Sequence, residues 1–204
     1  MGVRHGAEHL QEQPHASVDS ETPRVAPDVD RLAFNVLKDN VRLSRTDPSI
    51  DQVSDVPMGK FRERVGQRVN VLILAKSTKV ESVRAASLLQ AALAREDDIA
   101  GLPHETVVMN FTDAAALGAE AKKRSVSVVY VPPGFDAELE SICSAMQPLG
   151  VMTITAVPDY VRRCVVVGFE AVSGKPKLLI HLGQARRHGI DFKSEILKLA
   201  KVYR

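Results

Sequence analysis

The sequence predicts an α/β fold, a doubly wound and mostly parallel sheet that closes with a C-terminal antiparallel hairpin and a docked final helix. Three observations lead to this prediction. Apolar, β-branched runs recur along the chain and are typical of strands buried on both faces. Segments of 10–18 residues with helical spacing separate them, which favours right-handed crossovers. After residue 165 the alternation breaks, because two strand-like runs are joined by a short turn.

The first 66 residues differ from the rest of the chain. Residues 1–27 are polar, contain three prolines and lack an apolar period, so we expect a disordered tail. Residues 28–66 are expected to form a short helical lead-in, with one amphipathic helix that ends before Asp47-Pro48 and a second over Pro57–Arg64. The compact α/β domain is expected to span residues 67–204.

The first strand and helix of this domain follow one another directly. The run Arg68–Ala75 predicts a strand, and Thr78 with Glu81 has the spacing of a capping box. Apolar residues then recur every three or four positions, which predicts a helix with one buried stripe: Val80, Val83, Ala86, Leu89 and Leu93.

The same unit repeats along the chain. The predicted elements are a strand Glu105–Met109, a helix Asp113–Lys123, a strand Ser125–Val131, a helix marked by Phe135, Leu139, Ile142 and Met146, and a strand Val151–Val157.

The C-terminal part is expected to be antiparallel. Strands Val165–Val172 and Leu178–Leu182 flank Ser173-Gly174-Lys175-Pro176, which predicts a hairpin turn. A final helix is then expected to dock on the sheet, capped by Asp191 and with one apolar stripe formed by Phe192, Ile196, Leu199 and Tyr203.

Charge and hydropathy exclude some functional classes. The formal net charge of +2 gives no long-range field toward nucleic acid or an anionic membrane. The longest apolar run, Val71–Ala75, is far too short to span a bilayer. The residues behind Met1 contain no apolar stretch typical of an export signal, which by itself favours a cytoplasmic location. Residues 175–204 carry eight bases against two acids, which fits either a solvated helix face or a surface for an acidic partner.

The two cysteines, Cys143 and Cys164, match no metal-binding spacing. Two isolated buried thiols are the favoured interpretation. The alternative is a disulfide, which would close a loop of about 20 residues and add about 3 kcal/mol in an oxidising compartment.

Catalytic and cofactor sites are expected in the loops that follow the parallel strands. None of these loops contains a dinucleotide-binding or phosphate-binding glycine motif, and Lys76 and Pro132 stand where a phosphoacceptor domain needs acids. Ser173-Gly174-Lys175 lies between two strands, which favours a turn over a phosphate loop. We therefore expect no catalytic residue, no metal site and no cofactor.

The histidines are interpreted as structural. His181 alternates with apolar neighbours and His104 opens a strand, and neither has a second ligand at metal spacing. His188, beside two arginines, is expected at the surface at a helix end.

The remaining candidates are ligand-binding residues at the strand ends. In the turn Lys76-Ser77-Thr78, amides of a helix N-terminus beside a lysine could hold an anion, although capping alone would also explain Ser77 and Thr78. Polar side chains in the other strand-end loops complete the set: Asn110, Asp159 and Tyr160.

The segment from Val69 to Tyr203 resembles the YfiR family. The similarity rests on the apolar first strand, on the strands Ser127–Val131 and Met152–Thr155, and most specifically on the closing segments Lys177–Arg186 and Gly189–Ala200. In these closing segments a strand leads to a short helix, a Gly-Ile turn and a last helix ending Leu-Lys-Leu-Ala.

This resemblance implies a doubly wound α/β domain that is exported to the periplasm, is often a homodimer and has no enzymatic activity. It also implies a protein partner of the type of a membrane-anchored diguanylate cyclase, with effects on cyclic-di-GMP signalling and biofilm. The alternative is a receptor domain for a small ligand or anion, related to transport-associated binding proteins.

Overall fold

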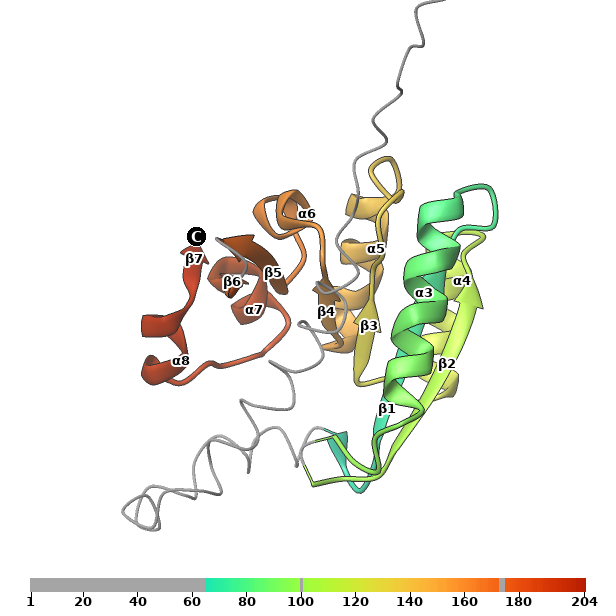
Figure 1. Cartoon of the computed structure of the whole chain (residues 1–204), viewed down its shortest axis with the longest axis horizontal. Coiled ribbons are helices and arrows are strands. Elements are labelled where there is room, and N and C mark those ends of the chain that lie inside the picture. Colours follow the sequence, from blue (N-terminus) through green and yellow to red (C-terminus); the bar gives the residue numbers. More distant parts are fainter. Residues whose placement is uncertain (1–64, 100, 173–174) are drawn as a thin grey trace, which may run out of the picture.

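A seven-stranded sheet with helices on both faces forms the body of the protein (Figure 1). The computed structural model describes residues 65–99, 101–172 and 175–204. The expected tail at 1–27 and nearly all of the expected lead-in at 28–66 lie outside the described residues.

The strands lie in the order β2-β1-β3-β4-β5-β6-β7, and all neighbouring pairs are parallel except β5 and β6. The predicted fold class is therefore confirmed. The strands are β1 Val69–Ala75, β2 His104–Asn110, β3 Val128–Tyr130, β4 Met152–Thr155, β5 Val167–Val172, β6 Lys175–His181 and β7 Lys201–Tyr203.

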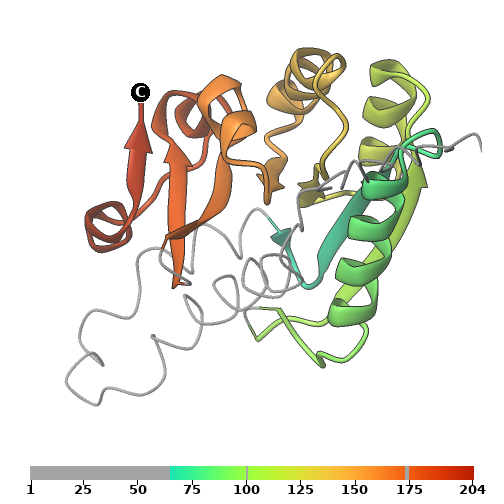
Figure 2. The same ribbon diagram turned by 45° about the horizontal axis from the view of Figure 1, so that its top comes forward.

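The helices connect and cover the strands. They are α3 Val80–Leu93, α4 Ala114–Lys123, α5 Leu139–Met146, the 3-10 turn η2 Gln147–Leu149, α6 Pro158–Arg163, α7 Leu182–Arg187 and α8 Ser194–Leu199. Helices α3 and α4 and strand β2 lie at one end of the molecule, and α7, α8 and β7 lie at the other (Figures 1 and 2).

The core has two layers, one on each face of the sheet. Alternate residues of β1 point into opposite layers, since Ile73 packs with Leu89 of α3 whereas Leu72 packs with Leu117 of α4. This explains why β1 is a continuous apolar run: both of its faces are buried.

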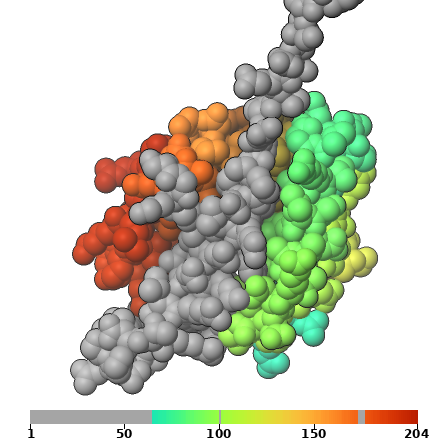
Figure 3. Space-filling model, viewed as in Figure 1, coloured from blue at the N-terminus to red at the C-terminus, as the bar shows by residue number. Residues whose placement is uncertain are grey.

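The start of α3 differs from the prediction. The N-cap residue is Lys79 and its side chain makes no capping bond, so Thr78 and Glu81 do not form the expected box. Val80 is 82% exposed, because the buried face of the helix begins with Ser82 instead of Val80 and Val83. The outer face of α3 belongs to the molecular surface (Figure 3).

The C-terminus also corrects the prediction. The last helix ends at Leu199, which is 67% exposed, and Ala200 is extended. The next three residues form β7, which pairs in parallel with β6, so Tyr203 belongs to a strand. The helix begins after Lys193, and Asp191 is not its cap. Pairing along the otherwise free edge of β6 outweighs the helical spacing of these residues.

The hairpin between β5 and β6 and the segment after β4 differ from the prediction in their boundaries. Lys175 pairs with Val172, so Lys175 and Pro176, expected in the turn, belong to strand β6. Pro158 opens helix α6, where a loop was expected, because proline fits the first turn of a helix.

Candidate functional site

The carboxyl ends of β1 and β3 define the place where a ligand would be expected in this fold. From β1 the chain crosses to β2 on one side, and β3 lies on the other side, so the strand order reverses between β1 and β3. Crevices at such switch points hold the ligands of doubly wound domains. Lys76 follows β1 directly, and the segment Gly134–Glu138 follows β3.

An ion pair within the chain occupies this switch point. Lys76 Nζ lies 2.7 Å from Oε1 of Glu138 and donates to the Gly134 carbonyl at 3.3 Å. Both side chains are mostly buried, with exposed fractions of 22% and 28%. Since a carboxylate already contacts the ammonium group, an anion at the site that the sequence suggested would compete with Glu138 for Lys76.

Aromatic rings close the space beside this ion pair. The Lys76 ammonium lies 5.8 Å from the ring centroid of Phe135, which is fully buried. Phe111, which follows β2, packs edge-on against Phe135 with the centroids 5.4 Å apart. Charged and aromatic side chains of the protein therefore contact one another at the switch point.

Two of the other candidates meet Lys76 in the same place. The Ser77 amide donates to Asn110 Oδ1 at 3.0 Å, which joins the loops after β1 and β2. Ser82 Oγ accepts from the Lys76 amide at 3.0 Å and holds the loop against α3. Thr78 is exposed. The turn is thus ordered by polar contacts within the chain.

Tyr160 fixes the loop that carries Glu138. Its hydroxyl accepts a hydrogen bond from the Phe135 amide at 2.8 Å and donates to Asp136 Oδ2 at 3.1 Å. Burial, followed by the negative charge of Asp136, raises the pKa of Tyr160 to about 12. Tyr160 is consequently a neutral structural hydrogen-bonding group at physiological pH.

Asp159 does not join this group. It is exposed and pairs with Arg162 on its own helix. The structure therefore brings Lys76, Ser77 and Asn110 together, places Tyr160 in the neighbouring loop, and leaves Asp159 at the surface.

Sequence reasoning missed Glu138, which is the residue that decides the chemistry of the switch point. For the loop after the third strand, the sequence prediction rests on Pro132, whereas the loop continues to Glu138 at the start of α5. The signal was available, since Glu138 is an acid one residue before an apolar helix stripe that begins at Leu139.

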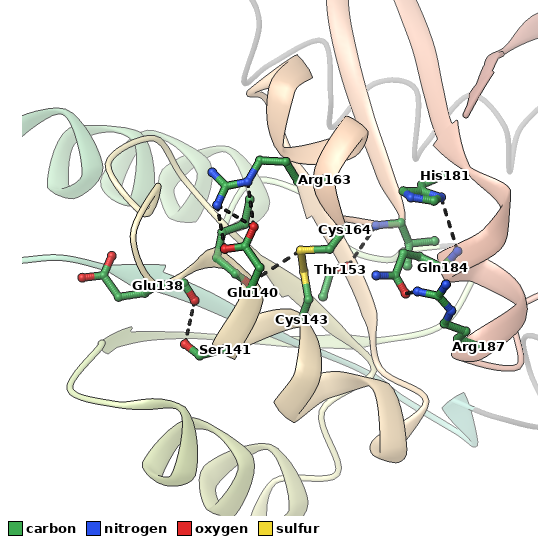
Figure 4. Close-up of a disulfide and its surroundings, with 12 residues drawn as sticks. Glu138, Glu140, Ser141, Cys143, Thr153, Arg163, Cys164, His181, Gln184 and Arg187 are labelled. Carbon is green, nitrogen blue, oxygen red and sulfur yellow. Dashed lines mark hydrogen bonds and ion pairs between the residues drawn. A yellow bond between two sulfur atoms is a disulfide. The ribbon is translucent and has the colours of Figure 1, made fainter. Parts of the chain in front are cut away.

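A disulfide joins the two cysteines, which the sequence had favoured as free thiols. Cys143 of α5 and Cys164 at the end of α6 have their Cα atoms 6.1 Å apart, and Figure 4 shows the bond between the two helices. Their spacing of 21 residues gave no sign of this proximity, because it depends on both helices packing on one face of the sheet.

An ion pair lies next to the disulfide. The Arg163 guanidinium contacts Glu140 of α5 with Nη2 2.6 Å from Oε2, and also donates to the Asp136 carbonyl at 2.8 Å (Figure 4). A side-chain hydrogen bond from Arg163 lowers the pKa of Glu140. Helices α5 and α6 are therefore linked twice, by the buried disulfide and by this more exposed ion pair.

The histidines have structural contacts. His104 lies 3.0 Å from the Glu96 carbonyl, and His181 Nδ1 accepts from the Gln184 amide at the start of α7 (Figure 4). Burial lowers the pKa of His181, with a further contribution from Arg187. His188 is buried and lies 2.8 Å from the Val151 carbonyl, which corrects the expected surface position, because α7 turns inward against the sheet.

Within the described residues, no group of three histidine, cysteine or carboxylate side chains could hold a metal ion. The helices of the described part include none that is both long and apolar enough to cross a bilayer.

Solved structures with a similar fold confirm the class of the domain. The ABC domain in complex with L-Trp from Streptococcus pneumonia is 16% identical, with a TM-score of 0.53 over 72% of this chain and 60% of that one. A conserved domain protein from Vibrio cholerae is 14% identical, with a TM-score of 0.51 over 72% of this chain and 58% of that one.

A third similar structure is CD0873 from Clostridium difficile, a substrate binding protein with adhesive properties, in its ligand-free, open form. It is 11% identical, with a TM-score of 0.52 over 73% of this chain and 60% of that one. The chain thus spans about 60% of the length of these proteins. These similarities show that the chain shares a doubly wound α/β fold with these proteins.

The chain belongs to the YfiR/HmsC-like family, whose profile matches residues 63–201. Membership supports a regulatory role in the periplasm in general terms. A search of curated proteins found no match.

Proposed function

We propose that this protein is a non-catalytic regulator of YfiR type that acts in the periplasm by binding a protein partner. Family membership over residues 63–201 supports the regulatory role. The observation that carries the proposal is the Lys76–Glu138 ion pair beside Phe135, which lies at the switch point where an enzyme of this fold would bind its substrate.

The partner that we propose is a membrane-anchored diguanylate cyclase, and the protein acts on it as a homodimer. This part of the proposal rests on the family resemblance, because function belongs to sites and partners and does not follow from the fold. Cyclic-di-GMP level and biofilm formation are then the outputs.

Deleting the gene from its host and measuring cellular cyclic-di-GMP tests the proposal. We expect the concentration to rise and to return to the starting value when the full chain is supplied again. A tagged full chain should also retain the cyclase from solubilised membranes. An unchanged cyclic-di-GMP level, together with no cyclase retained, would reject this function.

A second candidate is a receptor domain for a small ligand. Two similar structures favour it, one in complex with L-Trp and one a substrate binding protein. Because Glu138 holds Lys76, an anionic ligand would have to displace this carboxylate at the cost of breaking a charge-assisted bond.

Thermal unfolding with and without added ligand tests this candidate, because a ligand that binds only the folded state raises the midpoint. L-tryptophan and sulfate are suitable probes, with chloride at the same ionic strength as the control for sulfate. Equal midpoints in all conditions would argue against binding of these ligands.

A further inference from the structure

Within the part of the chain that the structure describes, strand β2 has no partner along its outer edge. It is the first strand in the sheet order and pairs only with β1 among the described residues. It is seven residues long and lies at the outer end of the sheet, next to α3 and α4 (Figure 2). The opposite edge strand, β7, has only three residues.

The hydrogen bonds to β1 show which backbone groups of β2 point outward. The ladder begins where the Val69 amide donates to the Pro103 carbonyl and ends where the Phe111 amide donates to the Ala75 carbonyl. In a parallel pair, alternate residues of a strand bond to the same neighbour. The odd-numbered residues of β2 therefore face β1, and Thr106 and Val108 direct their amides and carbonyls away from the sheet.

This edge lacks the features that usually prevent strands from pairing with other chains. The sequence from His104 to Asn110 contains no proline and no lysine, and Thr106–Met109 carries no charge. The one acid, Glu105, is paired at 3.0 Å with Arg68, which directly precedes β1. By contrast, β7 is short and has Lys201 and Arg204 at its ends.

We propose that β2 pairs antiparallel with β2 of a second copy, about a two-fold axis at Val107. This inference rests on the proposed homodimer and assigns its surface. With the axis at Val107, Thr106 lies opposite Val108 of the partner subunit, and both residues have outward backbone groups. They therefore form hydrogen-bonded pairs, as an antiparallel ladder requires.

The side chains fit this register. Glu105 lies opposite an uncharged methionine at position 109 in both halves of the interface, so no like charges meet across it. The two Val107 side chains form the central pair without hydrogen bonds, where opposite Cα atoms are about 4.5 Å apart. The two sheets would then join into one continuous sheet.

Cysteine cross-linking tests the register. Because Cys143 and Cys164 are the only cysteines and are bonded to each other, Val107→Cys introduces a single free thiol. The expected Cα separation fits a disulfide, whereas Met109→Cys would place its thiol about 13 Å from its counterpart, beyond disulfide reach. Both positions are on β2 and partly buried, so Met109→Cys is a matched control.

We expect mild oxidation of the full chain to convert Val107→Cys into a covalent dimer at least about ten times faster than Met109→Cys, as seen on a non-reducing gel. Equal rates, or no dimer from Val107→Cys, would overturn the proposal.

A backbone substitution provides a second test. Thr106→Pro removes an outward amide without touching the ladder to β1, and proline is tolerated on strand edges. Thr106→Ala keeps this amide and is the control. Analytical ultracentrifugation should show a dimer for the wild type and for Thr106→Ala and a monomer for Thr106→Pro, with unchanged circular dichroism. A Thr106→Pro dimer would overturn the proposal.

The outcome is separable from that of the proposed function. If the wild type is a dimer that Val107→Cys does not trap, the surface is wrong and the regulatory function stands. A wild-type monomer at all concentrations rejects both this surface and the homodimer, while cyclase binding is still decided by cyclic-di-GMP and membrane retention.

Discussion

Lys76 and Glu138 form an ion pair in a place that is mostly shielded from water. The carboxylate accepts the ammonium on Oε1, and its other oxygen, Oε2, is buried without a hydrogen-bond partner in the described part of the chain. A charge that loses its partner in such a place keeps its desolvation cost. The two residues therefore depend on each other more than a surface pair does.

Replacing Lys76 by methionine tests this dependence. We expect a loss of about 1–2 kcal/mol in the free energy of unfolding, because Glu138 is left charged, shielded and unpaired. The double variant Lys76→Met with Glu138→Leu should regain at least about half of the loss. Urea denaturation measures both.

Lys123→Met serves as the control, since Lys123 is 75% exposed and lies 3.8 Å from Glu120. Its effect should stay within about 0.5 kcal/mol. If Lys76→Met lowers the free energy of unfolding by no more than this control, the Lys76–Glu138 pair does not stabilise the fold.

Tyr160 gives a pH-dependent prediction. Its pKa of about 12 in the folded chain exceeds the ordinary value near 10, so folding disfavours the phenolate. The contribution of the phenol to stability is complete below pH 10 and is lost as the pH rises toward 12. The Tyr160→Phe variant should therefore lose stability less steeply than the wild type in this window.

Urea midpoints of both proteins at pH 8, 10 and 11 provide the measurement. At pH 8 the variant should already be less stable by about 1–2 kcal/mol, because the Phe135 amide loses its acceptor. Parallel curves for the two proteins would contradict the raised pKa.

The sequence predicted which candidate residues lie close together only where they stand at the ends of neighbouring strands. Lys76 and Asn110 end adjacent parallel strands, so their loops had to meet. The partner of Lys76 lies 62 positions away, and nothing in the sequence near Lys76 specifies it. Pairing of this kind follows from tertiary packing.

At the scale of elements, α6 and β5 pack unusually closely. A Cβ atom at Gly168 would lie 2.3 Å from Val161 Cγ2 and 3.1 Å from the Thr155 carbonyl oxygen. Gly168→Ala should destabilise the protein by about 1–3 kcal/mol, because the helix must move away from the strand.

Gly118, in the middle of α4, is the matched control because a Cβ atom there meets nothing within 4 Å. Gly118→Ala should stabilise the protein by about 0.5–1 kcal/mol, through the better helix propensity of alanine. Thermal unfolding of both variants shows the opposite signs. A neutral Gly168→Ala would mean that α6 adjusts freely.

The disulfide between α5 and α6 predicts a larger effect. Converting both cysteines to alanine should lower the free energy of unfolding by about 3 kcal/mol, because the unfolded chain loses a closed loop. Urea denaturation of the wild type with and without a reductant should reproduce the difference. A midpoint that does not respond to reduction would contradict this role.

Elements were predictable where periodicity and burial agree. For the strands and helices from Val69 to Thr155, the predicted positions hold, with ends that shift by a few residues. The prediction of one helix up to Tyr203 was wrong. Leu199 and Tyr203 have helical spacing, but β6 has an edge with which the extended segment β7 pairs. Spacing alone does not describe such an edge.

At the level of the whole molecule, the alternation of strands and helices predicts the parallel part of the sheet. The short link between β5 and β6 predicts their antiparallel pairing. The order of strands required the structure, since alternation is compatible with several orders. The contacts at the switch point could not be predicted from the sequence either. They depend on long-range packing of Phe135, Phe111 and the Lys76–Glu138 pair.

The segment from residue 63 to residue 204 is expected to contain the whole folded domain. The strands of the described sheet find their partners within residues 69–203, and the family match begins at residue 63. A chain of residues 63–204 should therefore unfold in one cooperative transition, with a midpoint within about 3 °C of the full chain, as expected for a single domain. Differential scanning calorimetry of both chains makes the comparison. A broad or missing transition in the shorter chain would show that the first 62 residues contribute to the fold.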